Sequence, residues 1–341
     1  MPVRLGVSDV VHILSQKFIM NEGIAGVSYT RSSEPRIRIY VEDPEAEAIV
    51  PERVMGYSTE VIYVGRITLL SASNIVEDVR RRVRPIPGGV SVGTLSGGTG
   101  TMSCWVYERG TGRKLMLSNR HVFVGPKGTK VIQPGVADGG GVPDDVVGTV
   151  YRSSRIDPPP ADNLVDAAVA KPISEDLFSE EIVGIGVVDG VVGAKEGMVV
   201  EKTGRTTGHT TGEIFDTHAT VKVHGYEWGF SIFSDQIIMK PSMSRPGDSG
   251  SLIVESGSKR AVGLLFAGSD VVTVANKIEN VLAELNISLA SPMEVPAPQL
   301  PRISWSSIVM STLPITVVGL TMASSEYTKY TKVRGQFRYL W

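Results

Sequence analysis

From residue 88 to about residue 290 the chain is a series of short β-prone runs separated by turns, and this pattern limits the possible folds more than any other feature. The runs lie at residues 102–107, 114–117, 166–170 and 251–255, with turns rich in Gly, Asp and Thr between them. Helical spacing returns only at residues 278–285, so strands and helices do not alternate. Such punctuation over roughly 200 residues predicts an all-β sandwich or barrel.

Residues 1–84 predict a separate, small α+β domain. Ser8 and Asp9 indicate a helix cap, and apolar residues follow at helical spacing up to Gly23. Strands are expected at residues 24–29, 36–41 and 59–67, with a short helical turn at residues 51–55. The basic run from Arg80 to Arg84 precedes prolines and glycines and indicates a linker, so the second domain is expected at residues 85–290. A processing site in the basic run is the alternative interpretation.

Residues 291–341 form a third region, a proline-rich linker followed by a C-terminal tail. Residues 303–325 carry no charged side chain, which is a property of membrane spans. Pro314, Gly319 and many Ser and Thr residues interrupt this run, and they favour a tail that packs or mediates homo-oligomerisation. A membrane anchor is the alternative.

The composition narrows the class of protein. Lys and Arg number 34 and Asp and Glu 36, so no global positive field attracts nucleic acid or anionic lipid. Cys104 is the single cysteine, which excludes an intrachain disulfide and suits a reducing compartment. It lies in an apolar run and is expected in the core. Residues 1–21 do not read as a secretory signal peptide, so a cytoplasmic protein is expected.

A nucleophilic serine is indicated by Gly247, Asp248, Ser249 and Gly250, which precede an apolar run. Glycine on both sides of the Asp-Ser pair permits a tight turn that exposes the hydroxyl and directs backbone N–H groups at a developing oxyanion. An ordinary hairpin turn is the alternative interpretation of this motif alone.

Two further residues fit the chemistry that an activated serine requires. A serine hydroxyl needs an adjacent base, and the base needs a carboxylate that sets its tautomer. His121 ends one β-prone run, and Asp166 opens a small apolar one. Asp166 follows His121 by 45 residues, and Ser249 follows Asp166 by 83 residues.

With this order and these intervals the chain resembles the serine peptidases of the chymotrypsin fold. The GRTTG stretch from Gly204 to Gly208 is similar to a hairpin of the bacterial α-lytic and streptogrisin branch. Glu201 and Thr211 stand where those enzymes place a disulfide, and Met243 stands at another of their cysteine positions. The likeness is therefore to a disulfide-free version of the fold.

A still closer resemblance is to prokaryotic trypsin-like peptidases that carry an N-terminal α+β domain and have plant relatives such as the narrow-leaf protein. The similar motifs are RPIPGGVSVG from Arg84, LSNRHV from Leu117, IQPG, NLVDAAVA from Asn163 and GLLFAGS from Gly263. Arg120 departs from the commoner Asn of the histidine motif, a change expected to affect a rim contact only.

The resemblance implies an all-β core made of two packed six-stranded β-barrels, with His121 and Asp166 in the first and Ser249 in the second. It implies a serine endopeptidase that forms an acyl-enzyme on Ser249, with His121 as the base and Asp166 orienting it. The N–H groups of Gly247 and Ser249 are expected to hold the oxyanion. Asp248 is expected to have a partner other than a new N-terminus.

The substrate is expected to be a peptide or protein. By position, Met243 and Ser244 are expected at the base of the substrate pocket, with Phe266, Ala267 and Gly268 along its wall. None of the five is acidic, which argues against Lys or Arg preference and leaves a medium-sized apolar residue before the scissile bond as the expectation.

No metal or cofactor is expected, because the histidine spacing matches no metal signature. Asp138, Asp144 and Asp145 are expected in a solvated turn, with calcium as the alternative. For the whole protein, the alternative to a peptidase is a catalytically idle double barrel that binds peptides or serves as an assembly scaffold.

Overall fold

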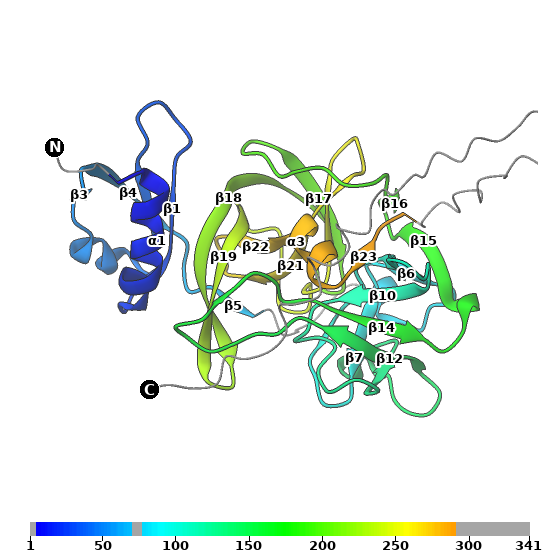
Figure 1. The fold of residues 1–341 in the computed structure, drawn as a ribbon. Coiled ribbons are helices and arrows are strands. Elements are labelled where there is room, and N and C mark those ends of the chain that lie inside the picture. Colours follow the sequence, from blue (N-terminus) through cyan, green and yellow to red (C-terminus); the bar gives the residue numbers. More distant parts are fainter. Residues whose placement is uncertain (1–4, 70–76, 291–341) are drawn as a thin grey trace, which may run out of the picture. The chain divides into compact units, whose positions relative to one another are not determined.

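The computed structural model describes residues 5–69 and 77–290, and two curled β-sheets make up most of it (Figure 1). The first sheet has eight strands in the order β23, β9, β10, β14, β12, β11, β7, β8. In chain order their bounds are β7 Ser91–Thr94, β8 Thr99–Thr101, β9 Trp105–Glu108, β10 Lys114–Ser118, β11 Lys130–Ile132, β12 Val146–Ser153, β14 Ala168–Pro172 and β23 Ile287–Ser288.

The second sheet contains a closed ring of six strands. Starting at β19, each strand pairs with the next in the order β22, β21, β20, β17 and β18, and β18 pairs again with β19. Their bounds are β17 Val199–Gly204, β18 Gly208–Tyr226, β19 Gly229–Met239, β20 Leu252–Glu255, β21 Ala261–Gly268 and β22 Thr273–Lys277, with the short β5 Thr68–Leu69 and β13 Asp162–Asn163 attached. The all-β core is confirmed, and its two sheets resemble a chymotrypsin-like double β-barrel.

Shorter elements connect these sheets. A three-stranded sheet joins β6 (Ile86–Gly88), β15 (Phe178–Ile182) and β16 (Gly186–Val187). The remaining helical pieces of this part are α2 Glu77–Arg80, η3 Val136–Asp138, η4 Glu175–Leu177 and α3 Ile278–Glu284. The helix predicted near residue 278 is therefore confirmed.

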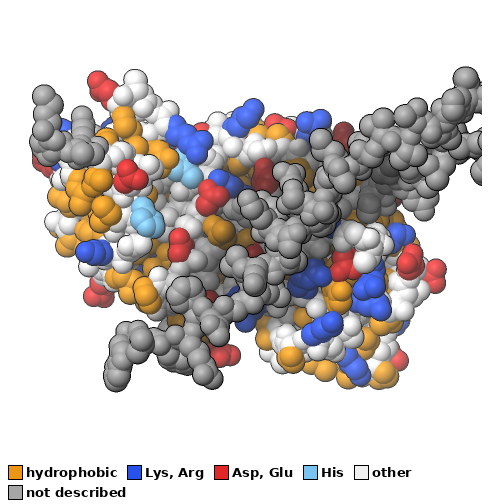
Figure 2. Space-filling model, in the orientation of Figure 1, with side chains coloured by type: hydrophobic (Ala, Val, Ile, Leu, Met, Phe, Trp, Pro, Cys, Tyr) orange, Lys and Arg blue, Asp and Glu red, His pale blue; other side chains and the backbone are white. Residues whose placement is uncertain are grey.

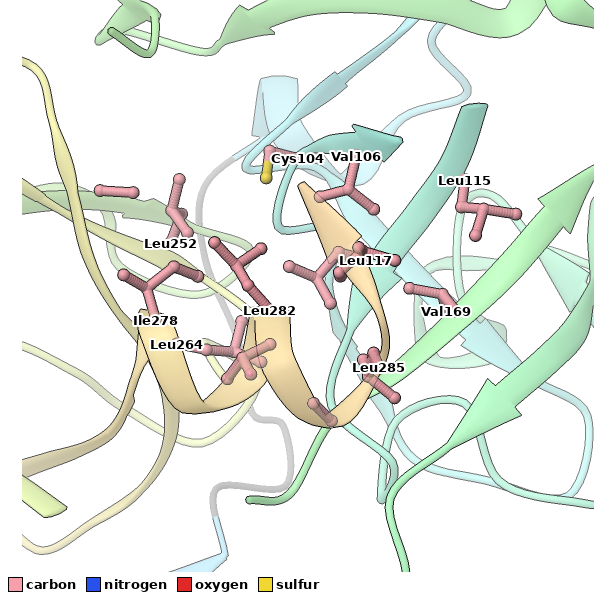
Figure 3. Close-up of a cluster of buried hydrophobic side chains, with 14 of the residues drawn as sticks. Cys104, Val106, Leu115, Leu117, Val169, Leu252, Leu264, Ile278, Leu282 and Leu285 are labelled. Carbon is pink, nitrogen blue, oxygen red and sulfur yellow. The ribbon is translucent and has the colours of Figure 1, made fainter. Parts of the chain in front are cut away.

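Helix α3 fills the space between the two sheets with apolar side chains. Figure 3 shows Leu282 between Leu252 of the second sheet and Leu117 of the first. Complete burial of a side chain of this size stabilises a protein by about 1.5–3 kcal/mol, so packing holds the sheets together here. Cys104 lies in the same cluster, as predicted, and burial raises the pKa of its thiol to about 12.

The N-terminal region combines helices and strands. Its elements are α1 Val7–Lys17, η1 Phe18–Met20, β1 Ile24–Tyr29, β2 Ile37–Val41, η2 Pro44–Ile49, β3 Arg53–Val54 and β4 Tyr57–Tyr63. The predicted cap at Ser8 is wrong: Gly6 is the N-cap, and its N–H donates to the Asp9 carboxylate (3.1 Å).

The helical turn predicted at residues 51–55 is also wrong. A helical turn forms earlier, in η2, because the Asp43 carboxylate caps it by accepting from the Ala46 N–H (2.9 Å) and Pro44 begins it. Strand β3 pairs with β4 across a turn in which Met55 and Gly56 take positive φ angles of 48° and 91°.

Strand β1 joins the N-terminal region to the second sheet. Gly26 lies opposite Val221 of β18, and Val27 lies opposite Thr220. A Cβ on Gly26 would lie 2.4 Å from the carbonyl oxygen of Thr220, so glycine permits this close approach. All the described residues belong to one compact unit, and the domain boundary at residues 84 and 85 stays a prediction.

The linker and tail at residues 291–341, including the stretch 303–325, lie outside the described residues. Within residues 5–69 and 77–290, every helix is too short or too polar to cross a membrane. Basic and acidic side chains are mixed on the face drawn in Figure 2, in keeping with the near-balanced charge of the chain.

Candidate active site

His121 and Asp166 form a hydrogen-bonded pair at one end of the first sheet. His121 comes shortly after β10 and Asp166 shortly before β14, and these strands are antiparallel neighbours with Ser118 opposite Ala168. The pair therefore meets at the same end of both strands. The Nδ1 of His121 lies 2.8 Å from Oδ2 of Asp166, and the His121 backbone N–H donates to Oδ1 (3.2 Å).

Asp166 is completely buried and held from several directions. Its N–H donates to Oδ1 of Asn276 (3.0 Å), its carbonyl accepts from Nδ2 of Asn119 (2.6 Å), and its Oδ2 accepts from the Tyr226 hydroxyl (3.0 Å). Burial by itself would raise the pKa of Asp166, but the charge and hydrogen bonds of His121 and the Tyr226 hydrogen bond outweigh it. The pKa lies below its usual 3.8, so the group is a carboxylate at neutral pH.

Ser249 lies on a tight turn that precedes β20. Gly247 and Gly250 bracket it with φ angles of +103° and +98°, a region that favours glycine. A Cβ on Gly250 would lie 2.1 Å from the carbonyl oxygen of Thr101, so a side chain is excluded there as well. The Ser249 side chain is buried, and its hydroxyl donates to the carbonyl oxygen of Phe266 (3.2 Å).

Strand β8, which ends at Thr101, brings the serine turn next to the histidine. The Thr101 N–H donates to the Ser249 carbonyl (2.7 Å), and its hydroxyl donates to the Gly247 carbonyl (2.9 Å). A Cβ on Gly100 would lie 2.8 Å from the Ser249 carbonyl oxygen and 2.4 Å from the side chain of Val122, which follows His121. Within the described residues, Nε2 of His121 is buried and has no hydrogen-bond partner, so no histidine–serine hydrogen bond is formed.

Asp248 has a lysine as its charged partner. Lys202 and Asp248 both have fully buried side chains, with Nζ 3.4 Å from Oδ2. The carboxylate also accepts from the N–H groups of Thr206 (2.8 Å), Thr207 (3.1 Å) and Arg245 (2.8 Å) and from the Thr207 hydroxyl (2.7 Å). The GRTTG hairpin thus fixes the residue next to Ser249, and Lys202 was not singled out from the sequence.

Substitution of Lys202 by Met is expected to destabilise the fold by about 3–5 kcal/mol, because it leaves the buried Asp248 carboxylate without a countercharge. The measurement is urea unfolding at pH 7. The double variant Lys202→Met with Asp248→Asn is the matched control, and it is expected to recover much of the loss because no buried charge remains. A single variant as stable as the parent would contradict this assignment of Lys202.

Arg205 of the same hairpin joins it to the glycine-rich loop. Its Nε and Nη2 donate to the two oxygens of Asp138 (2.7 and 2.5 Å) in a bidentate pair that is almost completely buried. The Ser91 hydroxyl donates to the same carboxylate (2.5 Å). Asp138 therefore has a structural ion pair and does not lie in a solvated turn, which corrects the expectation for this residue.

The five predicted pocket residues differ in their surroundings. Ser244 and Gly268 line a cavity of about 310 Å³ together with N-terminal residues that include Arg66 and Thr68. The other three, Met243, Phe266 and Ala267, are buried in the hydrophobic core. The assignment of this pocket and its apolar preference stay predictions.

Tyr226 is a second residue of the site, after Lys202, that sequence reasoning missed. It lies at the end of β18, donates to the Asp166 carboxylate, and stacks on Trp228 with ring centroids 5.6 Å apart. Burial, followed by the charge of Asp166, raises its pKa well above 10, so the hydroxyl stays a donor. No local motif distinguishes this tyrosine, because its partner lies 60 residues away.

The variant Tyr226→Phe is expected to lower kcat about tenfold with little change in KM, since a hydrogen bond to a charged group contributes about 1.5–3 kcal/mol and the ring stacking is kept. Tyr151→Phe is the matched control, because Tyr151 donates to the Glu108 carboxylate (3.0 Å) away from the site. Steady-state cleavage kinetics measure both variants. Equal kcat values for the two variants would mean that Tyr226 does not position Asp166.

Across residues 5–69 and 77–290, His, Cys, Asp and Glu form no group of three or more that could hold a metal ion. Two of the histidines instead lie beside a single carboxylate: Nε2 of His209 is 2.8 Å from Oε2 of Glu201, and Nε2 of His224 is 3.1 Å from Oε1 of Glu42.

The fold and the site together define an all-β double-barrel protein in which a histidine–carboxylate pair of one sheet lies near a serine turn of the other. No family model and no curated protein matches the chain. Solved structures do. Nocardiopsis protease is 22% identical, with 60% of this chain and 97% of that chain covered and a TM-score of 0.45. Cellulomonas bogoriensis chymotrypsin is 20% identical, with 60% of this chain and 98% of that chain covered and a TM-score of 0.44.

Thermobifida fusca protease A is also similar, at 21% identity over 61% of this chain and 99% of that chain, with a TM-score of 0.43. These neighbours are proteases by name. Because every one of these TM-scores lies below 0.5, the likeness carries no weight for activity or substrate.

Proposed function

We propose that the chain is a serine endopeptidase that hydrolyses peptide bonds through an acyl-enzyme on Ser249. The observation that supports it most is the hydrogen bond between His121 and the ionised, buried Asp166. An ionised carboxylate can only accept, so Nδ1 carries a proton, and in the neutral imidazole Nε2 is then the nitrogen with the free lone pair. The basic nitrogen is therefore available to a serine hydroxyl.

The proposed reaction begins when the Ser249 hydroxyl turns from the Phe266 carbonyl to Nε2 of His121. Oγ attacks the substrate carbonyl carbon, and Nε2 takes its proton. The N–H groups of Gly247 and Ser249 stabilise the oxyanion. His121 then protonates the leaving amine, and a water molecule activated by the same nitrogen hydrolyses the ester.

The second candidate function is a peptide-binding scaffold whose triad is idle. Two observations favour it: the Ser249 side chain is buried, and its hydroxyl is bonded to Phe266 instead of His121. A binding protein needs no hydroxyl at this position, whereas a peptidase does.

Labelling by a small fluorophosphonate discriminates between the peptidase and the idle scaffold. The parent protein is expected to be labelled at Ser249, and Ser249→Ala and His121→Ala are expected to remain unlabelled. Ser174→Ala is the control, because the Ser174 hydroxyl caps a 3-10 helix, where it accepts from the Asp176 N–H (3.2 Å) and donates to the Asp176 carboxylate (3.0 Å). Absence of label from the folded parent, or label retained in Ser249→Ala, would exclude the proposed peptidase.

A further inference from the structure

Strand β5 belongs to the N-terminal region but lies beside the end of β21, close to the residue that holds the Ser249 hydroxyl. It pairs antiparallel with β21, with Leu69 opposite Ala267 and Thr68 opposite Gly268. These two positions follow Phe266 directly, and the Phe266 carbonyl holds the Ser249 hydroxyl. A segment far away in sequence thus reaches within one residue of the proposed nucleophile's partner.

The edge that β5 covers is otherwise open in the described part of the chain. Strand β20 pairs with β21 up to Leu264, and two further hydrogen bonds at Leu265 end that ladder. Beyond this point β22 remains on one side of β21, with Ala267 opposite Val274, and β5 occupies the other side. Open sheet edges bind extended peptides through main-chain hydrogen bonds, so this edge suits a peptide that must reach Ser249.

Contacts on both sides hold the segment that contains β5. The Ile67 carbonyl accepts from the His224 N–H of β18 (3.1 Å). The Val64 carbonyl accepts from the Ser269 hydroxyl (2.5 Å), and Arg66 donates to Nδ1 of His224 (2.9 Å). Residues 64–69 are therefore hydrogen-bonded to both β18 and the end of β21.

The Leu69 side chain extends this contact to the histidine. It lines a cavity of about 630 Å³ that is also lined by His121, Tyr226 and Trp228. A Cβ on Gly225 would lie 3.4 Å from the Leu69 Cβ, so the backbone there fits closely against this side chain. An apolar side chain of the chain itself thus occupies space next to the proposed catalytic base.

We propose that β5 regulates the proposed peptidase by occupying the edge of β21 at Ala267 and Gly268 in the place of an extended substrate. The inference rests on the proposed function and adds a regulation to it. A tethered occupant acts at an effective concentration on the order of millimolar, so an extended substrate binds only when β5 leaves the edge. The chain as folded is then autoinhibited toward extended substrates, whereas labelling by a small probe does not depend on the edge.

The test uses the full chain carrying Ser249→Ala, so that no turnover interferes. A fluorescent synthetic peptide with the sequence of residues 64–69 is titrated against this protein and against the same protein with Leu69→Asp, and fluorescence anisotropy measures binding. Leu69→Asp places a charge in the contact with Gly225 and is expected to bind the peptide at least tenfold more tightly. The paired change Thr68→Gly with Leu69→Gly weakens β5 without a charge and is expected to act in the same direction.

Ile173→Asp is the matched control, because Ile173 is 63% exposed and lies after β14. It is expected to leave peptide binding unchanged. Circular dichroism and thermal unfolding establish that each variant is folded. Equal peptide binding by the parent and both folded β5 variants would show that β5 does not block this edge.

With Ser249 present, Leu69→Asp is expected to cleave a denatured protein at least ten times faster than the parent. If fluorophosphonate labels all variants but cleavage is not faster, autoinhibition is wrong. If fluorophosphonate labels none of them, the peptidase proposal fails, while the peptide titration in the Ser249→Ala background still decides whether β5 occupies the edge.

Discussion

Replacement of Ser249 by Ala is expected to reduce peptide hydrolysis by about five orders of magnitude or more, because the substitution removes the one atom that forms the acyl-enzyme. The fold is expected to survive. Among the described residues the Ser249 hydroxyl makes one hydrogen bond, to the Phe266 carbonyl, and loss of such a bond costs about 0.5–1.5 kcal/mol. Cleavage of a denatured protein substrate, measured in the parent and in the Leu69→Asp background, tests the rate.

Two controls accompany this measurement. His121→Ala is expected to lose a similar factor, and the double variant is expected to be no slower than either single one, since groups that act in one step are not additive. Urea unfolding of Ser249→Ala checks that the fold remains. In the Leu69→Asp background, equal cleavage rates with and without Ser249→Ala would refute the role of Ser249 in the proposed reaction.

The second large effect is expected for Asp166→Asn, which is predicted to lower kcat by about 10⁴-fold at neutral pH. The carboxylate accepts from Nδ1 of His121, whereas an amide that donates to Nδ1 moves the ring proton to Nε2. His121 then cannot take the serine proton. Steady-state cleavage kinetics at pH 7 measure the loss, and an Asn variant with parental kcat would contradict the proposed role of Asp166.

The same residue links stability to pH. The folded pKa of Asp166 is lowered below its usual 3.8, so its ionisation stabilises the folded protein fully above that value. This contribution is lost as pH falls below about 3.8 and through the folded pKa. Asp166→Asn lacks the group, so its unfolding free energy is expected to differ more from the parent's at pH 7 than at pH 3. Urea unfolding at both values tests this, and a difference independent of pH would contradict it.

Local sequence patterns predicted several elements well. The strand expected at residues 24–29 has the observed bounds of β1, and the helix expected at residues 278–285 corresponds to α3. Alternating or periodic apolar residues are a short-range signal, and it is read directly from the chain. The turn expected at residues 51–55 failed because a better cap at Asp43 placed the helical turn earlier.

Some residues of the candidate site could be predicted from the sequence and others could not. Its histidine, aspartate and serine each lie in a recognisable local motif, and the structure joins the first two at 2.8 Å. Lys202 and Tyr226 lie in no motif that marks a site, because their importance comes from partners far along the chain. Only their contacts in the folded structure identified these two residues.

The order and spacing of residues were enough to define an all-β core and to single out a serine, a histidine and an aspartate. Which surfaces come into contact was decided by tertiary structure. Strand β5 is the clearest case: two residues of ordinary sequence lie against β21, almost 200 positions away, because the edge of β21 is open and the His224 N–H of β18 donates to the carbonyl of the preceding Ile67. Main-chain pairing depends on the register and exposure of distant strands, and local side-chain preferences predict neither of them.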